Sequence, residues 1–341
     1  MPSVRIGDLP LQAGGTLRAP RISYESWGTP SEEAVLVCHA LTGDAHVAAA
    51  DGRPGWWDGI VGPGCAIDTR QRYVIASNVL GGCYGSSGPD AAGLGEDGAP
   101  FPRIFVQDMV AAQKALLRSL GVRRLRLVLG GSLGGLQALS WAGSADLPVQ
   151  QVVAIGASDR LPALQVALCH AQHQALEFGI ACGDPDGGLR VARSVAMATY
   201  RTDGHFAGRF GRTAASLPGT SRTFALETWL DHHGDRLARR FSATSYLALS
   251  RAMAAFQWDG AVRDGSRVDL IGIEGDWLFP PEDVAELHRA LRSRGVPGDH
   301  LVLSSEIGHD AFLAEQPATG ALLSTLIARA EGARPSKACA L

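Results

Sequence analysis

The chain contains 341 residues, of which 46% are hydrophobic and 19% are charged, and its formal net charge is −3 at pH 7. This length and composition allow a large core, either in one large domain or in a domain with an insertion. Lysines and arginines never exceed two in a row, and no apolar stretch reaches the roughly 18 residues of a membrane span, so we expect neither nucleic-acid binding nor membrane insertion.

Short apolar runs alternate along the chain with segments of helical spacing. The apolar runs predict strands at residues 34–38, 73–77, 125–129, 151–155, 268–273 and 301–304. Helical spacing predicts helices at residues 105–120, 133–142, 281–294 and 311–330. Almost wholly apolar strands that alternate with helices imply a mostly parallel, doubly wound sheet covered on both faces, so the predicted fold class is α/β.

A G-x-S-x-G sequence occupies residues 130–134, between a predicted strand and a predicted helix. In that context the serine lies on a strained turn that exposes its hydroxyl above the sheet edge. The flanking glycines are needed because larger side chains there would collide with neighbouring elements. The sequence therefore predicts Ser132 as a nucleophile. The alternative is a tight glycine turn that only packs the corner, since the chain contains 42 glycines.

The alternation of strands and helices stops between about residues 159 and 262. That stretch has helical spacing at residues 161–178, 189–200, 223–240 and 244–256 and contains no convincing strand. We therefore expect a core formed by residues 1–158 and 263–331, a helical lid insertion at 159–262, and a flexible tail at 332–341. The lid would shape a substrate pocket over the serine; the alternative is a set of helices that only pack.

A serine hydroxyl needs a base, and the base needs an orienting acid. In doubly wound hydrolase sheets these residues follow in the order serine, acid, histidine. Asp276 follows the strand predicted at 268–273, and His309 follows the strand predicted at 301–304. Both therefore lie at the carboxyl ends of strands, the edge at which such sheets bind ligands. We predict Asp276 as the orienting acid and His309 as the base.

Other residues compete for these two roles. Glu274 and Asp310 are alternative acids, and Glu274 could be structural at the sheet edge. His39 and His46 lie in an early loop and could line the site. The remaining candidates lie in the predicted insertion or on surface segments, at His232, His233, His288 and His300. Only His309 combines the expected order with a position at a strand end.

Two backbone N–H groups are expected to bind the oxyanion. In this architecture one belongs to the residue after the nucleophile and the other to an early loop between a strand and a helix. Those positions predict Leu133 and Leu41. The alternative for the early loop is a simple turn at residues 42–43.

The six cysteines are spread along the chain without a C-x-x-C pair: Cys38, Cys65, Cys83, Cys169, Cys182 and Cys339. The first residues lack the apolar segment of a secretion signal. We expect free thiols rather than disulfides or a zinc site, and a cytoplasmic enzyme.

Seven ordered segments resemble the homoserine O-acyltransferases of the α/β-hydrolase fold. They lie at residues 38–46, 55–59, 62–64, 77–85, 130–135, 275–281 and 308–312, and the resemblance spans residues 22–328. The GGCYG and DWLFPP sequences are the most distinctive of them. The resemblance implies acetyl transfer from acetyl-CoA to L-homoserine for methionine synthesis, through an acyl-Ser132 intermediate. It also implies a homodimer formed through insertion helices and no cofactor besides the co-substrate acetyl-CoA.

The resemblance further implies residues that bind the amino acid. Arg193 matches an arginine that binds the substrate carboxylate, Tyr200 matches a pocket position, and Asp310 matches an aspartate that binds the ammonium group. The alternatives are a surface arginine paired with Asp184 or Asp186, and an Asp310 that caps a helix.

The acyl group and the acceptor leave further alternatives open. Relatives that use succinyl-CoA resemble one another in carrying an arginine where this chain has Leu278, and an apolar side chain offers the succinyl carboxylate no partner. We therefore expect acetyl-CoA, with O-succinyl transfer as the alternative. Residues 161–178 and 179–188 depart from the family pattern, so serine or another hydroxyl compound is an alternative acceptor.

Two other classes of function stay open. A serine hydrolase would use the same three residues with water as acceptor, but it has no use for Arg193 and Asp310. A non-catalytic binding module has no reason to keep Ser132, Asp276 and His309 together.

Overall fold

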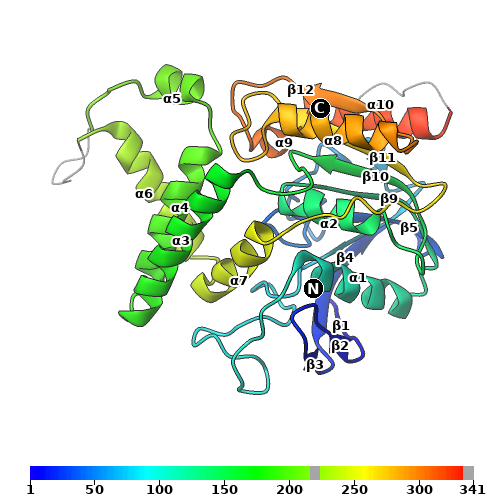
Figure 1. Ribbon diagram of the computed structural model, residues 1–341, viewed down its shortest axis with the longest axis horizontal. Coiled ribbons are helices and arrows are strands. Elements are labelled where there is room, and N and C mark those ends of the chain that lie inside the picture. The colour runs from blue at the N-terminus through cyan, green and yellow to red at the C-terminus, as the bar shows by residue number, and fades with distance from the viewer. Residues whose placement is uncertain (216–222, 333–341) are drawn as a thin grey trace.

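A computed structural model describes residues 1–215 and 223–332 of the chain. Its centre is an eight-stranded sheet with the strand order β1-β4-β8-β5-β9-β10-β11-β12 (Figure 1). From β8 to β12 the strands are parallel, whereas β4 runs antiparallel to both of its neighbours, β1 and β8. The bounds of the strands are β1 Ser3–Arg5, β4 Arg21–Trp27, β5 Glu33–Cys38, β8 Tyr73–Ser77, β9 Arg124–Gly131, β10 Val149–Ile155, β11 Arg267–Ile273 and β12 His300–Leu303. The mostly parallel α/β sheet predicted from the sequence is confirmed.

Alternate residues of the central strands face two separate hydrophobic clusters. In β5, Leu36 and Cys38 belong to one cluster, while Val35 and Val37 belong to the other. The first cluster includes side chains of α1 (Val106–Ser119), α2 (Leu133–Trp141) and α8 (Pro281–Ser293), and the second includes side chains of α10 (Gln316–Ala330). Because apolar side chains cover both faces, the strands read as continuous apolar runs.

Between β10 and β11 the described residues form five helices, which stand beside the sheet (Figure 1). They are α3 Ala163–Ala181, α4 Pro185–Thr199, α5 Asp203–Arg209, α6 Ala225–Ala238 and α7 Ala243–Ala254. Helix α4 packs against both α3 and α6. They lie within the insertion predicted at residues 159–262, whose bounds and role as a lid stay predictions. Residues 333–341 of the predicted tail lie outside the part of the chain that the structure describes.

Several local expectations were wrong or incomplete. The single helix predicted at residues 311–330 is divided into α9 (Ala311–Ala314) and α10, with Glu315 between them in a non-helical conformation. Pro317 near the start of α10 lacks a backbone N–H and is suited to the first turn of a new helix. The sequence reading also missed β1, β4, α5 and two short strand pairs, β2 (Leu9–Pro10) with β3 (Thr16–Leu17) and β6 (Val61–Gly62) with β7 (Ile67–Asp68).

Candidate active site

Ser132 lies on the sharp turn between β9 and α2. Its φ of 56° and ψ of −126° are strained for a residue with a side chain. Its backbone N–H donates to the carbonyl of Ile155, 2.9 Å away, which ties the turn to β10. A side chain at Gly131 would collide with the ring of Phe312, and one at Gly134 would collide with the carbonyl of Cys38. The predicted need for small residues around Ser132 is therefore confirmed.

Asp276 and His309 meet at the carboxyl ends of β11 and β12. Oδ2 of Asp276 lies 2.7 Å from Nδ1 of His309. Oδ1 of the same carboxylate accepts the N–H groups of Leu278 at 2.8 Å and Phe279 at 3.0 Å. Because both oxygens are held by fixed partners, the carboxylate orients the imidazole with Nδ1 protonated and Nε2 free to act as a base.

The free nitrogen of His309 is buried, and His309 shares a cavity with Ser132. His309 is 2% exposed, and its Nε2 has no hydrogen-bond partner among the described residues. His309 and Ser132 line the same cavity, which has a volume of about 560 Å³. A buried nitrogen without a partner is costly unless its function is to exchange a proton. This arrangement suits a base that takes the hydroxyl proton of Ser132.

The environment of His309 moves its pKa in opposing directions. Burial lowers the pKa of His309. The charge of Asp276 and the hydrogen bond to Asp276 raise the pKa by more than burial lowers it, so the pKa lies above its ordinary value of 6.5. Tyr200, Phe279 and Phe312 surround the imidazole, with ring centroids 5.4 to 6.0 Å away. These rings keep water away from the His309–Asp276 pair and strengthen their attraction.

We expect kcat/KM to fall as pH decreases through this raised pKa, because protonated His309 cannot accept the serine proton. The acid limb of the pH profile should therefore have its midpoint above 6.5. Replacing Asp276 with asparagine removes the charge that raises the pKa, so the midpoint should move to lower pH. A midpoint that stays the same in that variant would show that another group controls the profile.

Two backbone N–H groups are available near Ser132. Those of Leu41 and Leu133 donate to no other group of the described chain. His39 orients the first of them: its Nδ1 lies 2.7 Å from the carbonyl oxygen of Ala40, and its Nε2 accepts the N–H of Val79 at 3.1 Å. Because the peptide bond between residues 40 and 41 is trans, fixing its carbonyl also fixes the N–H of Leu41 on the opposite side. His39 is therefore a structural residue of this loop, not a competing base.

The alternative acid Glu274 and the early-loop histidine His46 lie outside the cavity. Glu274 accepts a hydrogen bond from Ser304 at 2.6 Å. His46 pairs with Glu25 at 2.8 Å. Neither lines the cavity that contains Ser132.

The residues predicted to bind an amino acid also line this cavity. The guanidinium of Arg193 lies 5.5 Å from the ring of Tyr200, a favourable cation–π distance. Asp184, the predicted alternative partner of Arg193, instead caps α4 through the N–H of Gly187 at 2.8 Å. Burial raises the pKa of Tyr200 to about 12, so its hydroxyl stays neutral.

Asp310 has a partner that the sequence reading missed. Its Oδ2 lies 2.6 Å from Nη1 of Arg201, which also donates to the carbonyl of Tyr200. Asp310 makes no side-chain hydrogen bond that caps α9, so the alternative role as a helix cap does not hold. Arg201 directly follows Tyr200, and this adjacency to a predicted pocket residue was the one signal that could have found it.

Leu278 does not line the cavity. Its side chain is buried, and its contribution to the site is the backbone N–H that donates to Asp276. Its role in choosing the acyl group stays a prediction. Further side chains that the sequence reading did not select line the cavity at Trp56, Tyr84, Arg236, Arg240, Phe312 and Leu313.

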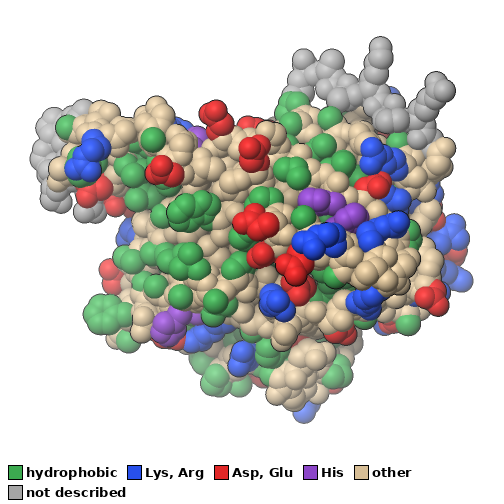
Figure 2. Space-filling view, turned by 45° about the horizontal axis from the view of Figure 1, so that its top comes forward, with side chains coloured by type: hydrophobic (Ala, Val, Ile, Leu, Met, Phe, Trp, Pro, Cys, Tyr) green, Lys and Arg blue, Asp and Glu red, His purple; other side chains and the backbone are tan. Residues whose placement is uncertain are grey.

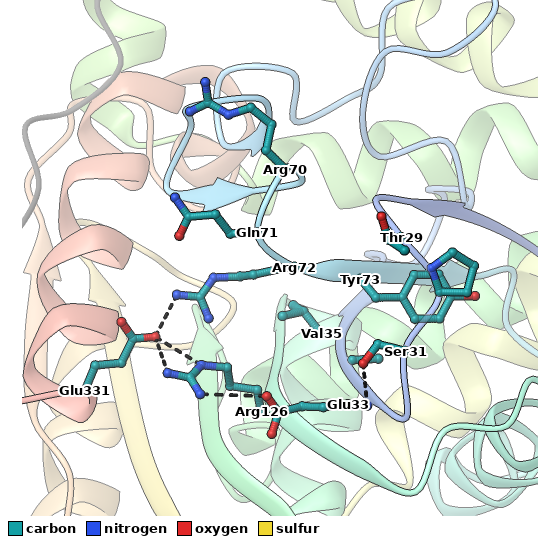
Figure 3. Close-up of a pocket in the computed structure, with 12 residues that line it drawn as sticks. Thr29, Ser31, Glu33, Val35, Arg70, Gln71, Arg72, Tyr73, Arg126 and Glu331 are labelled. Carbon is teal, nitrogen blue, oxygen red and sulfur yellow. Dashed lines mark hydrogen bonds and ion pairs between the residues drawn. The ribbon is translucent and has the colours of Figure 1, made fainter.

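Another cavity, of about 530 Å³, lies at the amino-terminal edge of the parallel strands, away from Ser132 (Figure 3). Its arginines already have carboxylate partners. Arg72 and Arg126 both pair with Glu331, at 2.6 and 2.8 Å, and Arg70 pairs with Asp68 at 2.7 Å. Because these charges compensate one another, we assign this cavity no ligand.

Comparison with known proteins identifies the family of the chain. Residues 33–316 match the family model of the alpha/beta hydrolase fold. A homoserine O-acetyltransferase of Thermobifida fusca (strain YX) is 39% identical over 355 residues, which cover 94% of this chain and 92% of the relative.

Solved structures of an acetyltransferase and of an esterase share the fold of this chain. The homoserine O-acetyltransferase of Bacillus anthracis has a TM-score of 0.84 at 20% identity, covering 99% of this chain and 98% of that one. Esterase E22 has a TM-score of 0.85 at 22% identity, covering 96% of this chain and 99% of that one. The fold alone therefore does not distinguish a transferase from a hydrolase.

Proposed function

The chain belongs to the homoserine O-acetyltransferase family of the α/β-hydrolase fold, and we propose that it transfers the acetyl group of acetyl-CoA to the side-chain hydroxyl of L-homoserine. The observation that carries this proposal is a pair of opposite charges, Arg193 and Asp310, in the cavity that also contains Ser132. An amino acid presents a carboxylate and an ammonium group, which such a pair complements. A hydrolase of uncharged esters has no use for it.

The first half of the reaction acetylates the enzyme. Nε2 of His309 takes the proton of Ser132 as Oγ attacks the thioester carbonyl. The N–H groups of Leu41 and Leu133 stabilise the oxyanion that forms. When this intermediate collapses, the carbon–sulfur bond breaks, and the CoA sulfur leaves with the proton from His309. Acetyl-Ser132 remains.

The second half transfers the acetyl group to the acceptor. His309 takes the proton of the homoserine hydroxyl, whose oxygen attacks the acetyl carbonyl. O-acetylhomoserine leaves as the proton passes from His309 back to Oγ of Ser132. Asp276 stabilises the imidazolium in both halves. We infer that the reaction needs no further cofactor and that the product serves methionine synthesis. We also propose that it takes place in the cytoplasm, where acetyl-CoA is available.

The recognition of homoserine depends on opposite charges at its two ends. Arg193 would bind the carboxylate. Asp310 would bind the ammonium group through the oxygen that Arg201 does not occupy, because a carboxylate accepts several hydrogen bonds. The preference for acetyl over succinyl rests on the curated relatives, which are homoserine O-acetyltransferases, since the Leu278 side chain lies outside the cavity.

Release of CoA tests this function directly. Acetyl-CoA and succinyl-CoA are each combined with homoserine, serine and water. We expect rapid release only with acetyl-CoA and homoserine together. Equal release of CoA with water would establish a hydrolase instead. Release that requires serine would show that serine, not homoserine, is the acceptor.

Arg193→Gln should lower kcat/KM for homoserine by about 10²-fold, the typical effect of losing a charge-assisted hydrogen bond. The rate of enzyme acetylation before acceptor addition should stay within about threefold of wild type, since Arg193 contacts only the acceptor in this account. Arg190→Gln is the matched control, because Arg190 lies on the same helix and pairs with Asp235. Equal losses in both half-reactions would contradict this role.

We also propose that the chain forms a homodimer through the helical insertion. Hydrophobic side chains gather over this part of the molecule (Figure 2), and large exposed ones on α3 and α4 include Leu164, Phe178 and Val191. We infer that these exposed apolar side chains take part in the interface, since large exposed apolar patches mark interaction sites. The molar mass in solution, measured by light scattering, tests the proposal.

No helix among the described residues is long and apolar enough to cross a membrane.

A further inference from the structure

Three arginines and two aspartates line the cavity around Ser132; with Arg193 and Asp310 assigned to homoserine, two arginines and Asp44 remain. Besides Arg193, it is lined by Arg236 on α6 and by Arg240 just beyond the end of that helix. Both of these arginines are exposed, whereas Ser132 and His309 are buried. The two arginines therefore lie where the cavity opens to solvent, and the reacting groups lie at its inner end.

Among the residues that the structure describes, neither arginine forms an ion pair with a carboxylate, and Asp44, which also lines the cavity, accepts the N–H of His46 at 2.9 Å. Within the described part of the chain, Arg236 forms no ion pair. Arg240 donates to the carbonyl of Thr42 and to the hydroxyl of Tyr84, both at 2.8 Å, and both acceptors are uncharged. By contrast, Arg190 and Arg251 on neighbouring helices pair with acidic side chains.

The positive field around α6 also acts on a neighbouring histidine. His233 packs on Trp229 with ring centroids 4.3 Å apart. Burial lowers the pKa of His233 to about 4, and the positive charges of Arg193, Arg201 and Arg236 lower it as well. His233 therefore stays neutral near pH 7 and adds no further positive charge to the cavity.

We propose that Arg236 and Arg240 bind the phosphate groups of the CoA thioester, an inference that rests on the proposed function. The donor has its thioester at one end of a long uncharged arm and its diphosphate and 3′-phosphate at the other. The cavity has the matching order, with the nucleophile buried and the two guanidinium groups at the opening. Guanidinium groups bind phosphate oxygens through two parallel hydrogen bonds, and their field also speeds the approach of an anionic donor.

The inference is tested with donors that differ only in their phosphates. Acetyl-CoA, 3′-dephospho-acetyl-CoA and S-acetyl-pantetheine are compared at saturating homoserine, with wild type, Arg236→Gln and Arg240→Gln. We expect each substitution to lower kcat/KM for acetyl-CoA by about tenfold. With S-acetyl-pantetheine, which has no phosphate, Arg236→Gln should stay within about twofold of wild type.

Arg239→Gln is the matched control, because it removes the same charge from a neighbouring residue that does not line the cavity. The result for Arg236→Gln decides between the outcomes. Arg240→Gln could also act by releasing the loop that contains Thr42, because Arg240 donates to the carbonyl of Thr42. If Arg236→Gln lowers kcat/KM equally for all three donors, or for none, the inference is overturned.

Calorimetric titration with CoA and with pantetheine separates this result from the proposed function. If Arg236→Gln weakens CoA binding but not pantetheine binding, the phosphate site stands whatever the acceptor is. If the wild type turns over none of the three donors with homoserine yet binds CoA through these arginines, only the proposed acceptor is wrong. If the wild type binds CoA no more tightly than pantetheine, the phosphate site itself is refuted.

Discussion

Replacing Ser132 with alanine is expected to lower the rate of acetyl transfer by at least about 10⁴-fold, because it removes the hydroxyl on which the acetyl intermediate forms. The substitution removes only the hydroxyl oxygen, so the turn and the free N–H groups of Leu41 and Leu133 stay in place. Any residual activity would come from binding and from the oxyanion site. The rate of CoA release with saturating acetyl-CoA and homoserine measures the effect.

Ser140→Ala provides the control for this substitution. Ser140 lies on α2, and its hydroxyl donates to the carbonyl of Leu136 at 3.0 Å, outside the cavity. This variant should keep wild-type activity. A Ser132→Ala protein that unfolds like the wild type and still transfers acetyl groups within about tenfold of its rate would rule out covalent catalysis by Ser132.

Asp276→Asn should lower kcat by about 10⁴-fold while leaving the fold intact. An asparagine oxygen can still accept the N–H groups of Leu278 and Phe279. Its amide nitrogen would then face Nδ1 of His309 as a donor. This favours the tautomer with the proton on Nε2, the nitrogen that must be free to take a proton from Ser132.

Glu274→Gln is the matched control, because it removes the other carboxylate that follows β11. Glu274 accepts a hydrogen bond from Ser304 and does not line the cavity, so we expect activity within about twofold of wild type. Steady-state kinetics on both variants, with circular dichroism to compare their folds, give the result. A larger loss of kcat in Glu274→Gln than in Asp276→Asn would show that Glu274, not Asp276, is the acid that orients His309.

The reacting residues could be predicted from the sequence because each is marked locally. Ser132 lies in a glycine-flanked turn after an apolar strand, and Asp276 and His309 follow strands in the order that such sheets require. Parallel strands bring their carboxyl ends to one edge of the sheet. Ser132 and His309 therefore line the same cavity although they are 177 positions apart in the sequence. The structure adds the distances and shows which nitrogen of His309 is free.

Contacts that depend on tertiary packing could not be predicted in this way. Arg201 and Asp310 are 109 positions apart, and their pairing depends on how the insertion packs against the loop after β12. The role of Leu278 as a backbone donor to Asp276 depends on the path of that loop rather than on its side chain. Strand β4 was missed because polar residues interrupt its apolar pattern, as expected of a strand near the sheet edge.

Intact-mass spectrometry shows whether acetyl transfer passes through Ser132 to homoserine. The protein is mixed with acetyl-CoA alone, and homoserine is added afterwards. We expect one added acetyl group per chain, located on Ser132 by peptide mapping, absent in Ser132→Ala, and lost to homoserine much faster than to water. A wild-type enzyme that turns over without ever carrying this acetyl group would exclude the acyl-Ser132 intermediate, and one that loses it equally fast to water would be a hydrolase.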